Sequence, residues 1–123
     1  MVHDNRITGY SVNIEERSLI IHTCHEDRNI LTDIIFTDVM THSFDCVMPD
    51  SIILDLTERS IVDFVDDNLD QLLELQPFGW PVFYRSMTEL EDLLAAENFH
   101  YFALSSSYGM FGWVLAKGCK ISS

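Results

Sequence analysis

The segment His22–His25 has residue types that bind metals or act as nucleophile and base. On a β-strand, alternate side chains point to the same face, so His22 and Cys24 would lie together. His42 or Cys46 on a neighbouring strand would add a third ligand, and these residue types suit zinc. The spacing matches no structural zinc pattern, however, and one strand supplies only two ligands. We therefore expect no metal and no cofactor, with Cys24 in the core and the histidines hydrogen-bonded.

Two groups have the residue types of a catalytic nucleophile. Cys24 beside His22 or His42 would need a depressed thiol pKa, which an acidic chain opposes. The segment Ser105–Gly109 is rich in hydroxyls but lacks the glycine-flanked serine of a strand-to-helix nucleophile turn. The sequence favours a protein without enzymatic activity. The alternative is a small enzyme, or a metal- or ligand-binding domain, that uses His22, Cys24 and His42.

Charge limits the partners that this chain can bind. Seven Lys and Arg face twenty Asp and Glu, for a net charge of −13. Binding to a nucleic-acid backbone or to an anionic membrane needs clustered Lys and Arg, so we expect neither. Eleven of the acidic residues, but only Arg59 of the basic ones, lie in residues 33–74. Charge therefore favours a basic protein as partner.

Helical spacing predicts a helix over residues 60–75, with an apolar side and an acidic side. The apolar residues at this spacing are Ile61, Val65, Leu69, Leu72 and Leu73, and the first four are expected on the side opposite the acidic one. The acidic stripe consists of Asp63, Asp66, Asp67, Asp70 and Glu74. Its like-charge pairs four residues apart would destabilise the helix by about 1 kcal/mol in total. Such a stripe is either a solvated face or a docking face, and the docking face is our functional hypothesis.

The rest of the chain supplies the elements that would carry these residues. Runs rich in β-branched residues predict strands over 10–14, 18–25, 30–44 and 51–56, the third bulged near Thr37-Asp38. Ser60 and Ser86 each precede an acidic residue at capping distance, which predicts helices over 60–75 and 87–97. Strands return over 100–106 and 110–116, around a turn at Ser107–Gly109.

The order β-β-β-β-α-α-β-β predicts an α+β fold. We expect an antiparallel sheet of five to six strands, with two helices packed on one face above Trp113 or Val114. The chain is predicted to be one domain over residues 1–123, with residues 1–8 as a disordered tail or an edge strand. The aromatic residues of the loop between the helices, Phe78, Trp80, Phe83 and Tyr84, either plug the end of the core, which we favour, or form an exposed binding spot.

Sequence signals also bear on where the protein resides. The residues Met1–Arg6 lack a basic stretch followed by an apolar one, so we expect no signal peptide and a cytoplasmic protein. Apolar runs are too short for a helix that spans a bilayer. The three cysteines form no CxxC pair, and we expect reduced, largely buried thiols.

Two parts of the chain resemble known proteins. They are Thr32–Phe36, continuing through Val39 and His42–Phe44 to Ile52–Leu56, and Tyr101–Ala116. They resemble small uncharacterised bacterial proteins of about this length, and similar acidic α+β chains occur among immunity proteins of toxin systems. The resemblance covers most of the chain and brings no catalytic motif. It implies a non-enzymatic, immunity-like role, with a basic partner such as a nuclease toxin.

Overall fold

A computed structural model describes residues 2–122 of the chain. The described residues form six strands, three α-helices and one 3₁₀ turn, in the order β1 (Arg6–Asn13), β2 (Ser18–His25), β3 (Ile30–Asp45), β4 (Ile52–Arg59), α1 (Ile61–Asp67), α2 (Leu69–Leu75), η1 (Gln76–Phe78), α3 (Met87–Ala96), β5 (His100–Tyr108) and β6 (Phe111–Ser122). The α+β class and the antiparallel six-strand sheet are confirmed, with three helices between β4 and β5 in place of two.

The sheet closes into a barrel in the order β1-β2-β3-β6-β5-β4. Backbone hydrogen bonds make the closure: Ile7 N–H donates to the Ser51 carbonyl at 2.8 Å, and Ile53 N–H donates to the Asn5 carbonyl at 3.0 Å. Of the predicted tail over residues 1–8, Met1 lies outside the described residues, Val2 and Asn5 are buried, and β1 begins at Arg6. The chain start is thus part of the closure.

Strand β3 is irregular where the sequence predicts it. Asp38 has a φ of 52°, and the pairing with β6 shifts register between Val39 and Thr41. The extra residue is Met40, whose side chain packs with the helices, whereas Ile34 and Phe36 fill the barrel. Strict alternation along the strand would place Met40 on the same face as those two residues, and the bulge turns it away.

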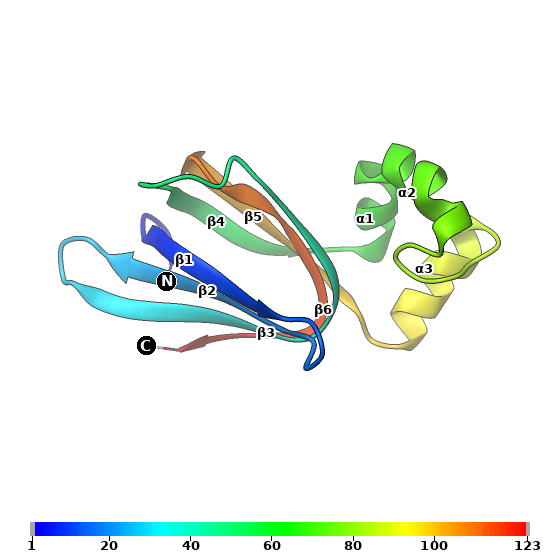
Figure 1. Cartoon of the computed structure of the whole chain (residues 1–123), viewed down its shortest axis with the longest axis horizontal. Coiled ribbons are helices and arrows are strands. Elements are labelled where there is room, and N and C mark those ends of the chain that lie inside the picture. Colours follow the sequence, from blue (N-terminus) through cyan, green and yellow to red (C-terminus); the bar gives the residue numbers. More distant parts are fainter. Residues whose placement is uncertain (1, 123) are drawn as a thin grey trace.

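Strands β5 and β6 have buried side chains on both faces. Phe102, Val114 and Ala116 point into the barrel core, while Tyr101 and Trp113 pack against the helices. The helices therefore cover the outer face of β5 and β6 at one end of the barrel (Figure 1). Of the two residues expected beneath the helices, Trp113 lies there and Val114 does not.

The predicted helix over residues 60–75 is broken at Asn68, which has φ −117° and ψ 20°. The Asn68 backbone N–H and side-chain Nδ2 both donate to the Phe64 carbonyl, so a side-chain bond competes with continuation of the helix. The break changes which residues face inward: Leu72 is fully buried, but Leu69 is 40% exposed and Leu73 55% exposed. The predicted burial of Leu69 is wrong, because it assumed one continuous helix.

Both predicted helix starts are confirmed. The Ser60 hydroxyl accepts from the Asp63 N–H at 3.0 Å, and the Ser86 hydroxyl accepts from the Glu89 N–H at 3.1 Å. The predicted turn over Ser107–Gly109 is right only for Gly109, which has a φ of 79°, because β5 continues through Ser107 and Tyr108. Over residues 2–122, no helix combines the length and the apolar composition needed to cross a membrane.

The aromatic loop before α3 is divided between core and surface. Tyr84 is buried and Trp80 is half-buried, with its Nε1–H donating to Thr41 Oγ1 at 3.2 Å. Phe78 and Phe83 are 80% and 78% exposed. The predicted core role therefore holds for two of the four aromatic residues.

Candidate functional site

The sheet separates the residues that the sequence put forward as ligands. His22 lies on the outer face of the barrel, where its Nδ1 is 2.9 Å from an Asp33 carboxylate oxygen. Cys24 is on the same face of β2 and is buried. His42 pairs across the sheet with Val114, a residue of the barrel core, and so faces the opposite way. The three side chains do not converge, and within residues 2–122 no group of three or more His, Cys, Asp or Glu is placed to hold a metal.

The cysteines differ in their surroundings. Cys24 is buried and Cys119 is half-buried, but Cys46 is exposed, which corrects the expectation of three largely buried thiols. Burial, and in second place the charge of Glu58, raises the pKa of the Cys119 thiol to about 11. At neutral pH this thiol is protonated, and a protonated thiol is a poor nucleophile.

Serine hydroxyls at the end of β5 form hydrogen bonds with backbone carbonyls. The Ser105 hydroxyl donates to the Asp55 carbonyl at 3.3 Å, and the Ser107 hydroxyl donates to the Ile52 carbonyl at 3.4 Å. Both bonds link β5 to β4, the neighbouring strand. These serines therefore act in the sheet, as hydroxyls near a hairpin commonly do.

Two members of the acidic stripe, Asp63 and Asp67, form ion pairs and hydrogen bonds within the chain. Arg59 Nη1 donates to Asp67 Oδ2 at 2.6 Å, and Arg59 Nε lies 3.6 Å from Asp63. The Tyr101 hydroxyl also donates to Asp67 Oδ2, at 2.9 Å. Arg59 is thus placed between the two carboxylates that the sequence treated as a repelling pair. These two acids fasten α1 to the end of β4 and to β5.

The other three members, Asp66, Asp70 and Glu74, are exposed. Among the described residues none of the three takes part in an ion pair. The break at Asn68 places Asp70 in the first turn of α2, where the helix dipole stabilises a carboxylate. The repulsion expected of an unbroken helix is therefore smaller than the sequence suggested.

A hollow of about 380 Å³ lies at the junction of α1 and α2. It is lined by Asp66, Asp67, Asn68, Leu69, Asp70 and Gln71. Three of these six residues are carboxylates, and Leu69 is exposed beside them. Val62 and Leu73, which are 52% and 55% exposed, add apolar surface on the same two helices. The junction thus combines two carboxylates without an ion pair among the described residues, Asp66 and Asp70, with exposed apolar side chains.

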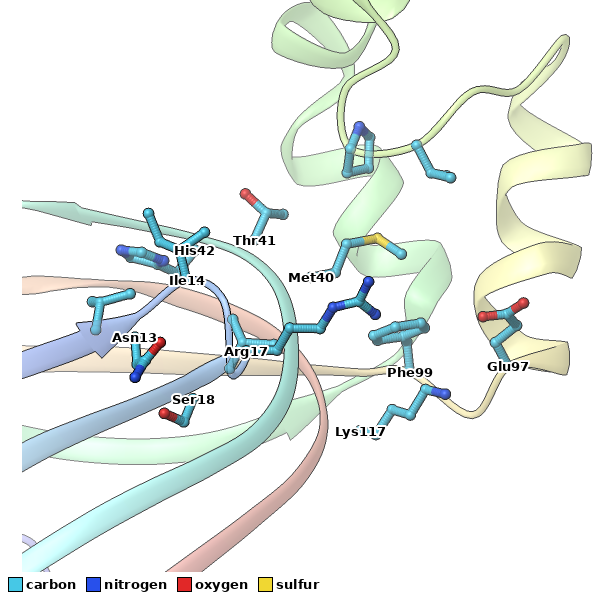
Figure 2. A pocket seen from close by; sticks show the side chains of 14 residues that line it. Asn13, Ile14, Arg17, Ser18, Met40, Thr41, His42, Glu97, Phe99 and Lys117 are labelled. Carbon is cyan, nitrogen blue, oxygen red and sulfur yellow. The ribbon is translucent and has the colours of Figure 1, made fainter.

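A larger cleft than this hollow lies between the barrel and the helices (Figure 2), and sequence reasoning missed it. Of the predicted residues it includes only His42, and burial lowers the pKa of that imidazole, which favours its neutral form. Arg17 and Lys117 also line it, although they are a hundred residues apart in sequence. Both are among the seven basic residues of an acidic chain. Composition alone did not indicate that these two would lie in the same cleft.

Comparison of the chain with protein-family models, curated proteins and solved structures finds no match.

Proposed function

We propose that this protein is a non-enzymatic binding module that docks a basic protein segment on the junction of α1 and α2. The observation that carries the proposal is the hollow between Asp66, Asp67 and Asp70, with Leu69 exposed at its side. A lysine or arginine side chain fits such a hollow, because a cation there gains charge-assisted hydrogen bonds to carboxylates. Apolar residues of the same segment would cover Leu69 and Leu73.

The distribution of charge supports a basic partner. Residues 33–74 hold eleven acids and one basic residue, and that residue, Arg59, is already paired with Asp63 and Asp67. The net charge of −13 would steer a basic protein toward the molecule and speed association. Nuclease toxins are basic where they bind nucleic acid, and the resemblance to immunity proteins makes such a toxin our proposed partner.

The structure changes which residues belong in the test. Asp63 and Asp67 hold α1 in place, so their removal would confound binding with stability. The informative variant is therefore Asp66→Asn, Asp70→Asn and Glu74→Gln together. Its matched control is Asp27→Asn, Asp45→Asn and Asp50→Asn, which removes the same charge from exposed loop and strand-end positions.

Both triple variants and the wild type are titrated calorimetrically with a panel of purified basic nuclease domains, at about 0.05 M and about 0.3 M salt. For the nuclease domain that binds the wild type most tightly, we expect the variant in Asp66, Asp70 and Glu74 to lose about tenfold in affinity at low salt. The salt dependence of its affinity should also be shallower than that of the wild type. The loop variant should lose less than threefold. Equal losses in the two variants, or no binding across the panel, would mean that the stripe is only a solvated face.

A further inference from the structure

The cleft between the barrel and the helices has a volume of about 710 Å³, which lies within the range of small-molecule sites. Five parts of the chain form it: the β1–β2 hairpin end, the bulge of β3, the loop before α3, the α3–β5 turn, and Lys117 of β6. Figure 2 shows their side chains around one space, with the α3 helix on the far side from the barrel. The cleft does not include the proposed docking face on α1 and α2.

Backbone geometry holds two of these walls in place. The Val39 N–H donates to the Arg17 carbonyl at 2.8 Å, which ties the β1–β2 turn to β3. The bulge beside it turns Met40 out of the barrel and into the cleft. Figure 2 shows the Arg17 side chain extending through the space toward Met40 and Phe99. The cleft is therefore built before any ligand arrives, which reduces the ordering cost of binding.

The charge of the cleft is opposite to that of the molecule. Arg17 and Lys117 line it with one carboxylate, that of Glu97, whereas the whole chain has a net charge of −13. Within residues 2–122 neither Arg17 nor Lys117 forms an ion pair. The Lys117 ammonium instead lies 5.3 Å from the centre of the Phe99 ring. Two cations are thus left available beside an apolar surface.

Apolar side chains make up much of the remaining lining. Met40, Val82 and Phe99 lie along the helix side of the cleft. At its rim Val12 and Ile14 are 39% and 84% exposed. An apolar ligand would remove this surface from water, which is favourable in proportion to the area buried. Binding would also give these rim residues the cover that they lack in the chain alone.

We propose that this cleft binds a small organic monoanion, a carboxylate with an apolar body. The carboxylate accepts hydrogen bonds from the Arg17 guanidinium, whose planar fork matches its two oxygens, and Lys117 adds a second positive charge. The apolar body lies along Met40, Val82 and Phe99. A single negative charge is specified because Glu97 and the acidic surroundings would repel a phosphate ester or another polyanion.

The probe is octanoate, titrated by calorimetry and followed in ¹H–¹⁵N spectra of the wild type. We expect the amide shifts to move for Arg17, Thr41, Val82 and Phe99. Hexanoate should bind more weakly by about fourfold for each methylene removed. Octanol and octylammonium, which keep the chain but lose the negative charge, should bind at least tenfold more weakly.

Arg17→Gln should weaken octanoate binding about tenfold or more, while the charge-matched Arg28→Gln, in the distant β2–β3 turn, should leave it unchanged. Both side chains are exposed, and unfolding midpoints of the two variants check that the fold is intact. The proposal is overturned if octanoate moves no cleft amide in the wild type, if octanol binds as well as octanoate, or if the two variants bind alike. The spectra of the wild type decide the question even where a variant is unstable.

Discussion

Tyr101 joins the helical layer to the sheet through both its ring and its hydroxyl. The ring meets Phe64 of α1 edge-on, with 5.3 Å between the ring centres. The hydroxyl donates to Asp67, which is also paired with Arg59. Burial of the phenol, and in second place this hydrogen bond, raises the pKa of Tyr101 to about 12. Asp67, which was proposed from the sequence as a docking residue, therefore links α1 to β4 and β5.

The raised pKa predicts a loss of stability in alkali. The ordinary pKa of tyrosine is 10.0, so ionisation of Tyr101 is harder in the folded chain than in the unfolded one. The protonated Tyr101 contributes fully to the free energy of unfolding below the ordinary pKa of 10.0. This contribution is lost as the pH rises toward 12. Urea denaturation at about pH 9 and about pH 11 should show a smaller loss for Tyr101→Phe than for the wild type. Equal losses would contradict the assigned network.

At the scale of elements, the break at Asn68 determines what the acidic helices present to solvent. One continuous helix would have placed Leu69 against the sheet, in line with Val65. Two short helices instead bury Leu72 and leave Leu69 at the rim of the hollow beside Asp70. The same break gives Asp70 a helix start, which lowers the electrostatic cost of the acidic surface.

This arrangement predicts different costs for two leucines of one helix. Leu72→Ala removes a fully buried side chain and should lower the free energy of unfolding by about 2–5 kcal/mol. Leu69→Ala removes a side chain that is 40% exposed and should cost less than about 1 kcal/mol. Chemical denaturation of the two variants beside the wild type provides the measurement. A Leu69 variant as unstable as the Leu72 variant would indicate a continuous helix.

At the scale of the whole molecule, the barrel and the helical layer contribute different features of the surface. The start of β1 and the end of β6 lie at the end of the barrel away from the helices (Figure 1). A tag or surface attachment at either end would therefore leave the α1–α2 junction uncovered. The helical layer carries the acidic hollow, and the cleft lies where the two layers meet.

The net charge of −13 predicts that added salt stabilises the protein. Among the described residues only Glu26, Asp63 and Asp67 of the acidic residues are paired with an arginine or lysine, so repulsion between carboxylates outweighs attraction. Between about 0.01 M and 0.1 M salt the screening length falls from about 30 Å to about 10 Å. The thermal unfolding midpoint should rise over this range of sodium chloride. A falling midpoint would mean that the ion pairs of Arg59 and Arg6 dominate instead.

Several features follow from residues that are close in sequence, and for these the sequence alone was sufficient. The serine caps of α1 and α3, the irregular point of β3 and the turn at Gly109 each depend on a few neighbouring residues. The concentration of acidic residues before and within α1 and α2 is likewise a property of composition. These local signals were enough for the α+β class and for the order of strands and helices along the chain, but not for the order of strands in the sheet.

Tertiary structure decided which of the proposed residues belong together. The side-chain bond of Asn68 to Phe64 competes with the helix, and only its outcome determines that Leu69 faces solvent. The parity of strand pairing places His22 and His42 on opposite faces of the sheet. Arg17 and Lys117 share a cleft because β3 pairs with both β2 and β6, which brings the β1–β2 turn and Lys117 to the same end of the sheet. Helical and strand periodicity describe neighbours along the chain, whereas sites are made by segments that meet only after the strands have paired.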